Sequence, residues 1–309
     1  MTTLLIEDPL FRQHLMPEGH PERPARLQAV EQVLAQDTFA NLRRERAVRA
    51  DPSAIELAHP AAHVSAVLAA APTDEFHFFD ADTPMSPKSA EVALHAVGSS
   101  LRAVDAVMNG EVKNAFVACR PPGHHAEKDT AMGFCFFNNI AIAARHAQRR
   151  HGAERVAIVD WDVHHGNGTQ DIFWNDKSVL FCSTHEMPLY PGTGAARETG
   201  EHGTILNVPL SAGDDGSVFK DHFRSIILPR LKAFGPDLIL ISAGFDAHVR
   251  DPLANIRLVE QDYAWATAEL MEIAAKRCNG RLVSLLEGGY DLQGLAFSVA
   301  AHVETLMGA

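Results

Sequence analysis

The sequence predicts an α/β fold, in which a mostly parallel central sheet is covered by helices on both faces to give three layers. Three observations support this prediction. Short apolar runs without alternation are typical of parallel strands buried on both faces. Helical patterns lie between these runs, as in a parallel α/β sheet. Dense polar clusters follow the runs directly, at the strand ends where ligand sites of such sheets lie.

Five apolar runs are expected to form the buried strands of this sheet. Each run is short and rich in leucine or in β-branched residues, and none alternates with polar side chains. The runs span residues 115–119, 156–159, 179–182, 238–241 and 282–286.

Five longer segments with apolar residues on one face are expected to form helices. They span residues 89–109, 138–150, 217–234, 259–277 and 292–307. The charged run at 43–49 (RRERAVR) is expected to be a solvated helix end or a loop.

The composition is that of a globular protein. The chain has 309 residues, of which 46% are apolar and 21% are charged. This excludes disordered, collagen-like and coiled-coil proteins and is enough for a large core. Because we find no internal repeat and no low-complexity linker, we expect residues 1–309 to form a single domain.

The charge balance narrows the classes of partner. With 27 Lys and Arg against 39 Asp and Glu, the formal net charge is −12. Binding to nucleic acid or to acidic lipid is therefore not expected, whereas cationic substrates are favoured. The four cysteines form no CxxC pair, and we identify neither a signal peptide nor a long apolar run. These features predict a cytoplasmic protein with reduced thiols and no membrane association.

Polar clusters follow all five predicted strands. They read RPPGHHAE, DWDVHHGNGT, STHE, SAGFDAH and EGGYD, in the order of the chain. Because the carboxyl ends of parallel strands meet at one edge of a sheet, we expect the clusters to converge on one crevice.

The second cluster indicates a metal site. Asp160, Asp162 and His164 alternate along the chain and would share one face of an extended segment. Two aspartates and one histidine suit a Zn²⁺ ion with three protein ligands and an open position. Asp246 is the candidate ligand from another strand end if Asp160 has a different role. The alternatives are a helix cap with surface histidines for the first segment and an ordinary turn aspartate for Asp246.

Two adjacent histidines, His124 and His125, follow a rigid Pro-Pro-Gly bend and suit general acid–base chemistry. Asp160 and Asn167 are available to fix their tautomers. Tyr290, after two glycines, could present a phenol to a developing oxyanion. In isolation, adjacent loop histidines are more often solvent-exposed, and a single tyrosine more often packs.

Taken together, these motifs resemble the histone deacetylase family, whose members have the arginase–deacetylase fold. The motifs that carry the resemblance occur in the family's order: RPPGHHAE, GFCFFNN, VDWDVHHGNGTQ, YPGTG, SAGFDAH and LLEGGYD. HPERPARL near the N-terminus is similar to the class II branch, and the short chain looks like a stand-alone bacterial member. The resemblance spans residue 20 to the C-terminus.

The resemblance implies a zinc-dependent deacetylase and assigns roles to the site residues. Asp162, His164 and Asp246 would bind Zn²⁺. His124 would pair with Asp160 and His125 with Asn167. His125 would act as general acid and base toward metal-activated water, and Tyr290 would stabilise the oxyanion, releasing acetate and a free amine.

The resemblance also implies a substrate tunnel for an acyl-lysine stem. Phe134 and Tyr190 would form its aromatic walls, with tyrosine standing where phenylalanine is usual. Gly133 would leave room for the stem, and Leu253 would stand at the rim.

Two potassium ions are implied in the same way. Asp160, Asp162, His164, Ser183 and Thr184 would hold one near the active site. Phe173, Asp176 and Val179 would hold the second through backbone oxygens.

Three rival interpretations remain open at this point. An acetylpolyamine amidohydrolase has the same chemistry and suits the charge of −12, although Leu253 lacks the carboxylate expected there. An arginase-like enzyme would need further aspartates to bridge two Mn²⁺ ions. A binding protein without catalysis would be expected to have a damaged site. Acetylated proteins, peptides and small amines therefore all remain candidate substrates, and a homo-oligomer is a further expectation.

Overall fold

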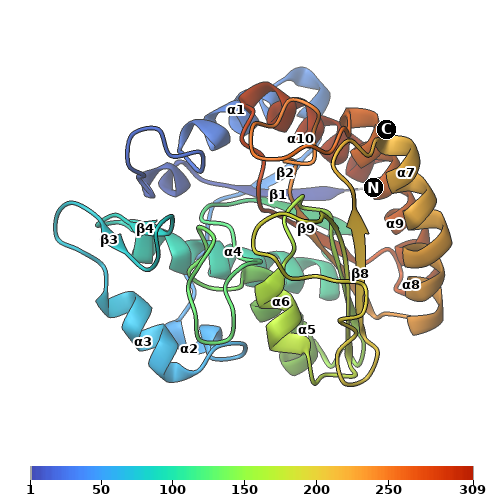
Figure 1. Ribbon diagram of the computed structural model, residues 1–309, viewed down its shortest axis with the longest axis horizontal. Helices are drawn as coiled ribbons and strands as arrows, with labels where there is room; N and C mark the ends of the chain where they lie inside the picture. Colours follow the sequence, from blue (N-terminus) through green and yellow to red (C-terminus); the bar gives the residue numbers. More distant parts are fainter. Residues whose placement is uncertain (1, 309) are drawn as a thin grey trace.

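The computed structural model, which describes residues 2–308, has an eight-stranded sheet at its centre (Figure 1). The strand order is β2-β1-β5-β10-β9-β6-β7-β8, and every neighbouring pair is parallel. The strands are β1 (Thr3–Glu7), β2 (Arg43–Glu45), β5 (Asn114–Ala118), β6 (Val156–Asp160), β7 (Val179–Glu186), β8 (Ile205–Leu210), β9 (Leu238–Ala243) and β10 (Leu282–Leu286). The predicted parallel sheet and all five predicted strands are confirmed.

The three strands of the eight-stranded sheet that were not predicted, β1, β2 and β8, lie toward its edges. The expectation of a loop or helix end at 43–49 was wrong for β2. This strand pairs its backbone with β1, while Arg43 and Glu45 form ion pairs at the surface. An edge strand needs no apolar run, because only one side of its backbone is paired. Likewise, β8 contains Pro209, which an edge strand tolerates.

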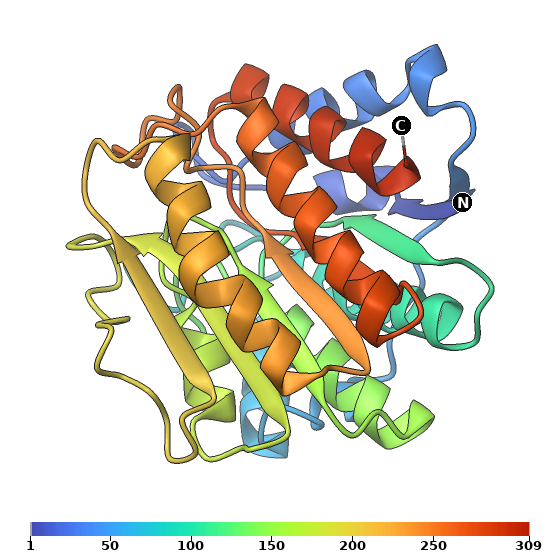
Figure 2. The ribbon, with the colours of Figure 1, turned by 90° about the vertical axis from the view of Figure 1, so that its right-hand side faces the viewer.

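Helices cover both faces of the sheet, as the three-layer prediction requires. One layer contains α4 (Ser89–Met108), α5 (Asn139–His151) and α6 (Asn167–Phe173). The other contains α1 (Ala25–Leu34), α7 (Gly216–His222), α8 (Leu228–Phe234), α9 (Glu260–Arg277) and α10 (Leu292–Met307). Figure 2 shows α9 and α10, in orange and red, lying across the near face of the sheet.

The helix predicted at 217–234 is interrupted by a π-helical turn, Phe223–Ile227. Pro229 follows this turn and has no N–H to donate to the preceding turn, which disturbs the regular hydrogen-bond ladder.

The remaining elements are short: η1 (Pro9–Gln13), η2 (Asp37–Phe39), α2 (Pro52–Ile55), α3 (Ala61–Ala69), β3 (His77–Phe78) and β4 (Pro84–Met85). None of the helices described here is both long and apolar enough to cross a membrane.

The parallel arrangement decides where polar side chains collect. The strands β5, β6, β9 and β10 are buried along their full length and are mostly apolar, so most of the nearby polar residues lie at their ends or in the loops beyond them. All these loops leave the same edge of the sheet, because the strands are parallel. The polar clusters identified in the sequence therefore meet at this edge.

Candidate active site

Three buried ligand atoms come together where β6, β9 and β10 end. His164 Nδ1 lies 3.1 Å from Asp162 Oδ1 and 3.1 Å from Asp246 Oδ2. Both carboxylates are fully or almost fully buried. The three atoms lie within 4.8 Å of one another, a spacing that permits a shared metal ion.

Backbone amides hold this cluster in place. Asp246 Oδ1 accepts a hydrogen bond from the N–H of Val163, and Asp162 Oδ2 accepts one from the N–H of Gly288. A Cβ atom at Gly288 would lie 2.2 Å from Asp246 Oδ2, and one at Gly244 would lie 2.1 Å from Asp162 Oδ2. The two glycines are therefore required where the backbone closes around the carboxylates.

The electrostatics of the cluster also favour a cation. Burial raises the pKa of Asp246, and the neighbouring Asp162 raises it further. Burial acts in the same direction on the pKa of Asp162, but His124 and His164 outweigh it and lower that pKa. Two buried carboxylates this close repel each other unless positive charge lies between them. Two oxygens and one imidazole nitrogen, with an open side, fit Zn²⁺.

The two adjacent histidines have different partners. His124 Nδ1 lies 3.0 Å from Asp160 Oδ2, and His125 Nδ1 lies 2.8 Å from Asn167 Oδ1. The amide nitrogen of Asn167 donates to Glu127 Oε1, which fixes the amide with its oxygen toward His125. His125 therefore donates its Nδ1–H to this oxygen and keeps a free lone pair on Nε2.

These partners separate the basicities of the two rings. Burial lowers the pKa of His124, but the charges of Asp162 and Asp160 outweigh burial and raise it well above its usual value. Burial lowers the pKa of His125 well below its usual value, and the neighbouring His124 lowers it further. One histidine is thus held as a cation beside a neutral one.

Tyr290 reaches the site from the loop after β10, with support from two side chains that our sequence analysis did not identify. Arg26 is fully buried, donates to the carbonyl oxygens of Gly289 and Glu287, and lies over the Tyr290 ring at 5.1 Å. Asp251 accepts from the backbone N–H of Tyr290 at 2.7 Å. Arg26 lies within the HPERPARL motif, and Asp251 follows SAGFDAH, but neither spacing indicates these contacts.

A cavity of about 390 Å³ leads to this cluster and contains all four predicted tunnel residues. Its lining comprises His20, Pro21, Ala81, Asp82, His125, Gly133, Phe134, His164, Leu189, Tyr190, Leu253 and Tyr290. Tyr190 packs edge-on against His125, and Phe134 packs edge-on against Tyr290. Glycine at position 133 also leaves space for the His125 ring, because a Cβ there would lie 2.6 Å from that ring.

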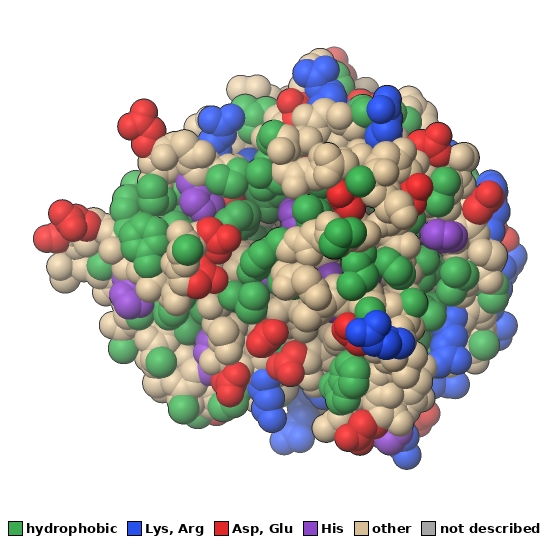
Figure 3. Space-filling model, in the orientation of Figure 1, with side chains coloured by type: hydrophobic (Ala, Val, Ile, Leu, Met, Phe, Trp, Pro, Cys, Tyr) green, Lys and Arg blue, Asp and Glu red, His purple; other side chains and the backbone are tan. Residues whose placement is uncertain are grey.

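The mouth of this cavity includes Asp82, between β3 and β4, which sequence reasoning did not identify. Figure 3 shows apolar and acidic side chains mixed over this hairpin, at the left of the view, and Phe78 is half exposed there. Burial raises the pKa of Asp82, and the adjacent Asp80 raises it further.

The residues predicted to hold potassium fall into two groups. Asp160 and Ser183 are paired across β6 and β7, and Asp160 Oδ1 accepts a hydrogen bond from the N–H of Asp162 in the carboxylate–histidine cluster. The other group lies around the end of α6, where Asp176 N–H donates to the Phe173 carbonyl oxygen and Val179 begins β7.

The eight-stranded parallel sheet, with this cluster at the carboxyl ends of its strands, has the arginase–deacetylase fold. The sequence profile of the histone deacetylase domain matches residues 20–306. This chain therefore belongs to the histone deacetylase family and is a deacetylase-type hydrolase.

Individual relatives agree with this membership. The chain is 39% identical to a probable deacetylase of Archaeoglobus fulgidus, over 95% of this chain and 83% of that protein. It is 45% identical to histone deacetylase 14, a chloroplast protein of Arabidopsis thaliana, over 70% of this chain and 53% of that one. The crystal structure of the HDA15 HD domain superposes with a TM-score of 0.94 at 38% identity, covering 100% of this chain and 89% of that one. The chain thus spans about half the length of the chloroplast relative.

Proposed function

We propose that this protein is a zinc-dependent amidohydrolase that removes acetyl groups from lysine side chains, with residues 1–309 forming one catalytic domain. One observation carries the proposal: His125, His164 and Tyr290 line one cavity. Asp162 and Asp246 contact His164, and the His124 ring lies 4.0 Å from the His125 ring. Asp162, His164 and Asp246 would hold Zn²⁺.

The metal would polarise the acetyl carbonyl and lower the pKa of water at its open position. His125 would take a proton from the attacking water on its free Nε2, because its Nδ1–H is donated to Asn167. It then returns the proton to the lysine nitrogen as the amide bond breaks. His124, held by Asp160, keeps its positive charge close to the reacting atoms throughout.

Tyr290 donates its hydroxyl proton in a hydrogen bond to the oxyanion that develops on the carbonyl. Burial raises the pKa of this phenol well above its usual value, so the hydroxyl remains a donor over the working pH range. Donors preorganised in this way are worth about 10²–10³ in rate.

The cavity suits a slender apolar chain with a polar end. Phe134 and Tyr190 offer ring surfaces to the methylene groups of a lysine stem, and Leu253 leaves the rim uncharged on one side. We also propose that K⁺ binds behind the site at Asp160 and Ser183, with backbone oxygens of Asp162, His164 and Thr184. Backbone oxygens of Phe173, Asp176 and Val179 would hold a second K⁺.

Asp82 supports a second candidate, an acetylpolyamine amidohydrolase. Its carboxylate lies at the cavity mouth, where it could hold the distant ammonium of a small diamine. The overall charge of −12 would attract such a substrate.

The deciding experiment measures acetate release by the zinc-loaded protein from an acetyl-lysine peptide and from N-acetylputrescine. Faster turnover of the peptide supports the first proposal, and preference for the polyamine supports the second. If Asp82→Asn selectively lowers polyamine turnover, the carboxylate sets that preference. Release from neither substrate would contradict both proposals, provided that zinc is bound with a stoichiometry of one at Asp162, His164 and Asp246.

A further inference from the structure

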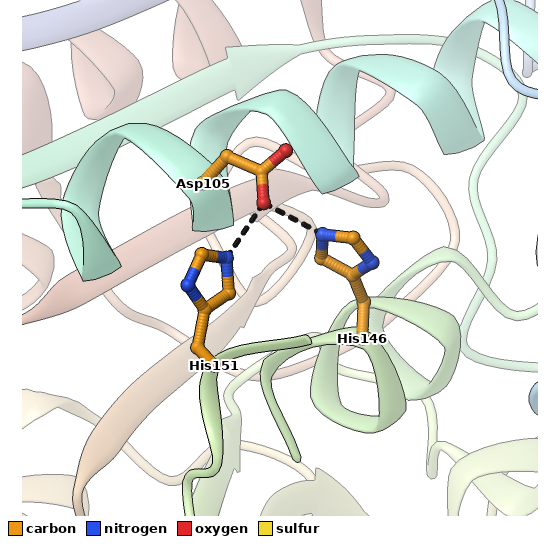
Figure 4. Close-up of side chains that lie close together, drawn as sticks. All are labelled: Asp105, His146 and His151. Carbon is orange, nitrogen blue, oxygen red and sulfur yellow. Dashed lines mark hydrogen bonds and ion pairs between the residues drawn. The ribbon is translucent and has the colours of Figure 1, made fainter. Parts of the chain in front are cut away.

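A second cluster of metal-ligating side chains lies away from the active site, between α4 and α5. Asp105 comes from α4, whereas His146 and His151 come from α5. Both Nε2 atoms lie 2.7 Å from the same oxygen, Asp105 Oδ1 (Figure 4). The three side chains are 11–35% exposed, so water and ions can reach them.

The secondary structure explains why these side chains converge. Both helices run back along the sheet, and their C-terminal ends lie side by side. Asp105 lies in the last turn of α4, and His151 is the last residue of α5, just before the left-handed Gly152 cap. This position lets His151 turn toward the same oxygen as His146, one and a half turns earlier.

The electrostatics of this location favour a cation. Each helix C-terminus carries roughly half a negative charge, so two of them meet here beside the Asp105 carboxylate. Partial burial raises the pKa of Asp105, but hydrogen bonds from both histidines outweigh it and lower the pKa. The carboxylate is therefore charged at neutral pH. The nearby Arg149 lines a different hollow with Leu57 and Arg145, on another side of α5.

We propose that Asp105, His146 and His151 form a second binding site, for a divalent transition-metal ion of the Zn²⁺ type. Two imidazoles and one carboxylate are ligands that Zn²⁺ accepts and that Mg²⁺ and Ca²⁺ do not select. At bond lengths of about 2.0–2.1 Å, tetrahedral ligand atoms lie roughly 3.3 Å apart, so each histidine nitrogen needs to move away from Asp105 Oδ1 by only about 0.6 Å. Water would complete the coordination.

This site is distinct from the candidate active site. Asn138, which caps the start of α5, donates to the Ala126 carbonyl oxygen just after the two catalytic histidines. The metal cluster lies at the other end of this 13-residue helix, roughly 20 Å away at 1.5 Å per residue. A metal ion here would fasten α5 to α4 without entering the catalytic cavity.

The test is the Zn²⁺ content of the full chain after equilibrium dialysis against buffered Zn²⁺. We expect about two ions per chain for the unaltered protein, and about one for Asp105→Asn and for His146→Gln with His151→Gln. His95→Gln is the matched control. It removes a partly buried histidine from α4 that lies 3.6 Å from a single carboxylate, that of Glu91, and should leave the content at two.

The same comparison in an Asp162→Asn, Asp246→Asn background separates this proposal from the proposed function. There we expect about one ion per chain, and none once Asp105→Asn is added. If the catalytic site bound no zinc, the unaltered protein would hold about one ion and Asp105→Asn none, while the counts in the Asp162→Asn, Asp246→Asn background would not change. Equal zinc content with and without Asp105→Asn, in folded protein, would overturn the second site. The cluster would then be a hydrogen-bonded clamp only.

Discussion

Asp251 offers the sharpest test of how the loop carrying Tyr290 is positioned. Its Oδ2 accepts from the N–H of Tyr290 at 2.7 Å and from the N–H of Asp291 at 3.4 Å. Its Oδ1 accepts from the N–H of Leu253 at 3.0 Å. One buried carboxylate thus joins the loop that carries the proposed oxyanion donor to the loop at the tunnel rim. We treat it as a positioning residue, because it acts on the reaction through Tyr290.

The substitution Asp251→Asn keeps the size of the side chain but turns one acceptor oxygen into a donor. That amide faces a backbone N–H, so at least one hydrogen bond is lost at a cost of about 1–3 kcal/mol. The most this can remove from catalysis is the contribution of the Tyr290 hydroxyl, about 10²–10³ in rate. We therefore expect kcat for an acetyl-lysine peptide to fall roughly 10- to 100-fold, with KM changing much less.

A double-mutant cycle makes this expectation refutable. If Asp251 acts by placing Tyr290, then Asp251→Asn should cost little further activity in a Tyr290→Phe background. Rates would be measured well below the melting temperature. Asp215→Ala is the control for stability loss, since it removes an exposed cap of α7 at a cost of about 1 kcal/mol and should leave kcat unchanged. An equal fold-loss in both backgrounds would refute the positioning role.

Four further outcomes are expected. Tyr290→Phe should lower kcat by about 10²–10³ while zinc content stays normal, and near-unaltered turnover would remove Tyr290 from the mechanism. Gly288→Ala should abolish zinc binding at Asp162 and Asp246, because its Cβ would lie 2.2 Å from Asp246 Oδ2. A normal zinc content would contradict the requirement for glycine at this position. Leu253→Glu should shift preference toward N-acetylputrescine, and an unchanged ratio of the two rates would exclude it from substrate selection. Burial lowers the pKa of His302 to about 3. Between pH 6.5 and 3 the imidazole of His302 therefore binds a proton only in the unfolded chain, and the free energy of unfolding decreases as the pH is lowered. His302→Gln should therefore spare about 2 kcal/mol of the loss in unfolding free energy between pH 6.5 and 4.5, and parallel curves for both proteins would contradict this.

The central part of the fold was predictable because burial leaves a clear pattern in the sequence. Strands covered on both faces must be apolar throughout, and β5, β6, β7, β9 and β10 were found by this signal. The edge strand β2, with the sequence RRE, has no such signal, since what defines it is a backbone pairing with β1. The π-helical turn before Pro229 likewise depends on helix packing that local periodicity does not record.

The same distinction applies to the residues of the candidate site: some could be predicted from the sequence, and others could not. Residues that carry the chemistry stand in dense motifs, because several polar side chains must leave each strand end together. Residues that orient them act across the chain: Arg26 reaches carbonyl oxygens more than 260 positions away, at Glu287 and Gly289. Such contacts leave no spacing in the sequence, so the structure is needed to find them.

The two adjacent histidines differ in a single hydrogen-bond partner, and this difference is enough to give the two rings different protonation states. Both rings are buried, and burial alone would keep both neutral. His124 faces the Asp160 carboxylate, whereas His125 faces the uncharged Asn167 amide. A charged partner stabilises the protonated ring, and an amide oxygen orients the neutral ring without stabilising a second positive charge. Because the rings are only 4.0 Å apart, the cation on His124 then opposes protonation of His125. In the proposed mechanism, aspartate at one position and asparagine at the other therefore give one histidine the role of electrostatic support and the other that of proton transfer.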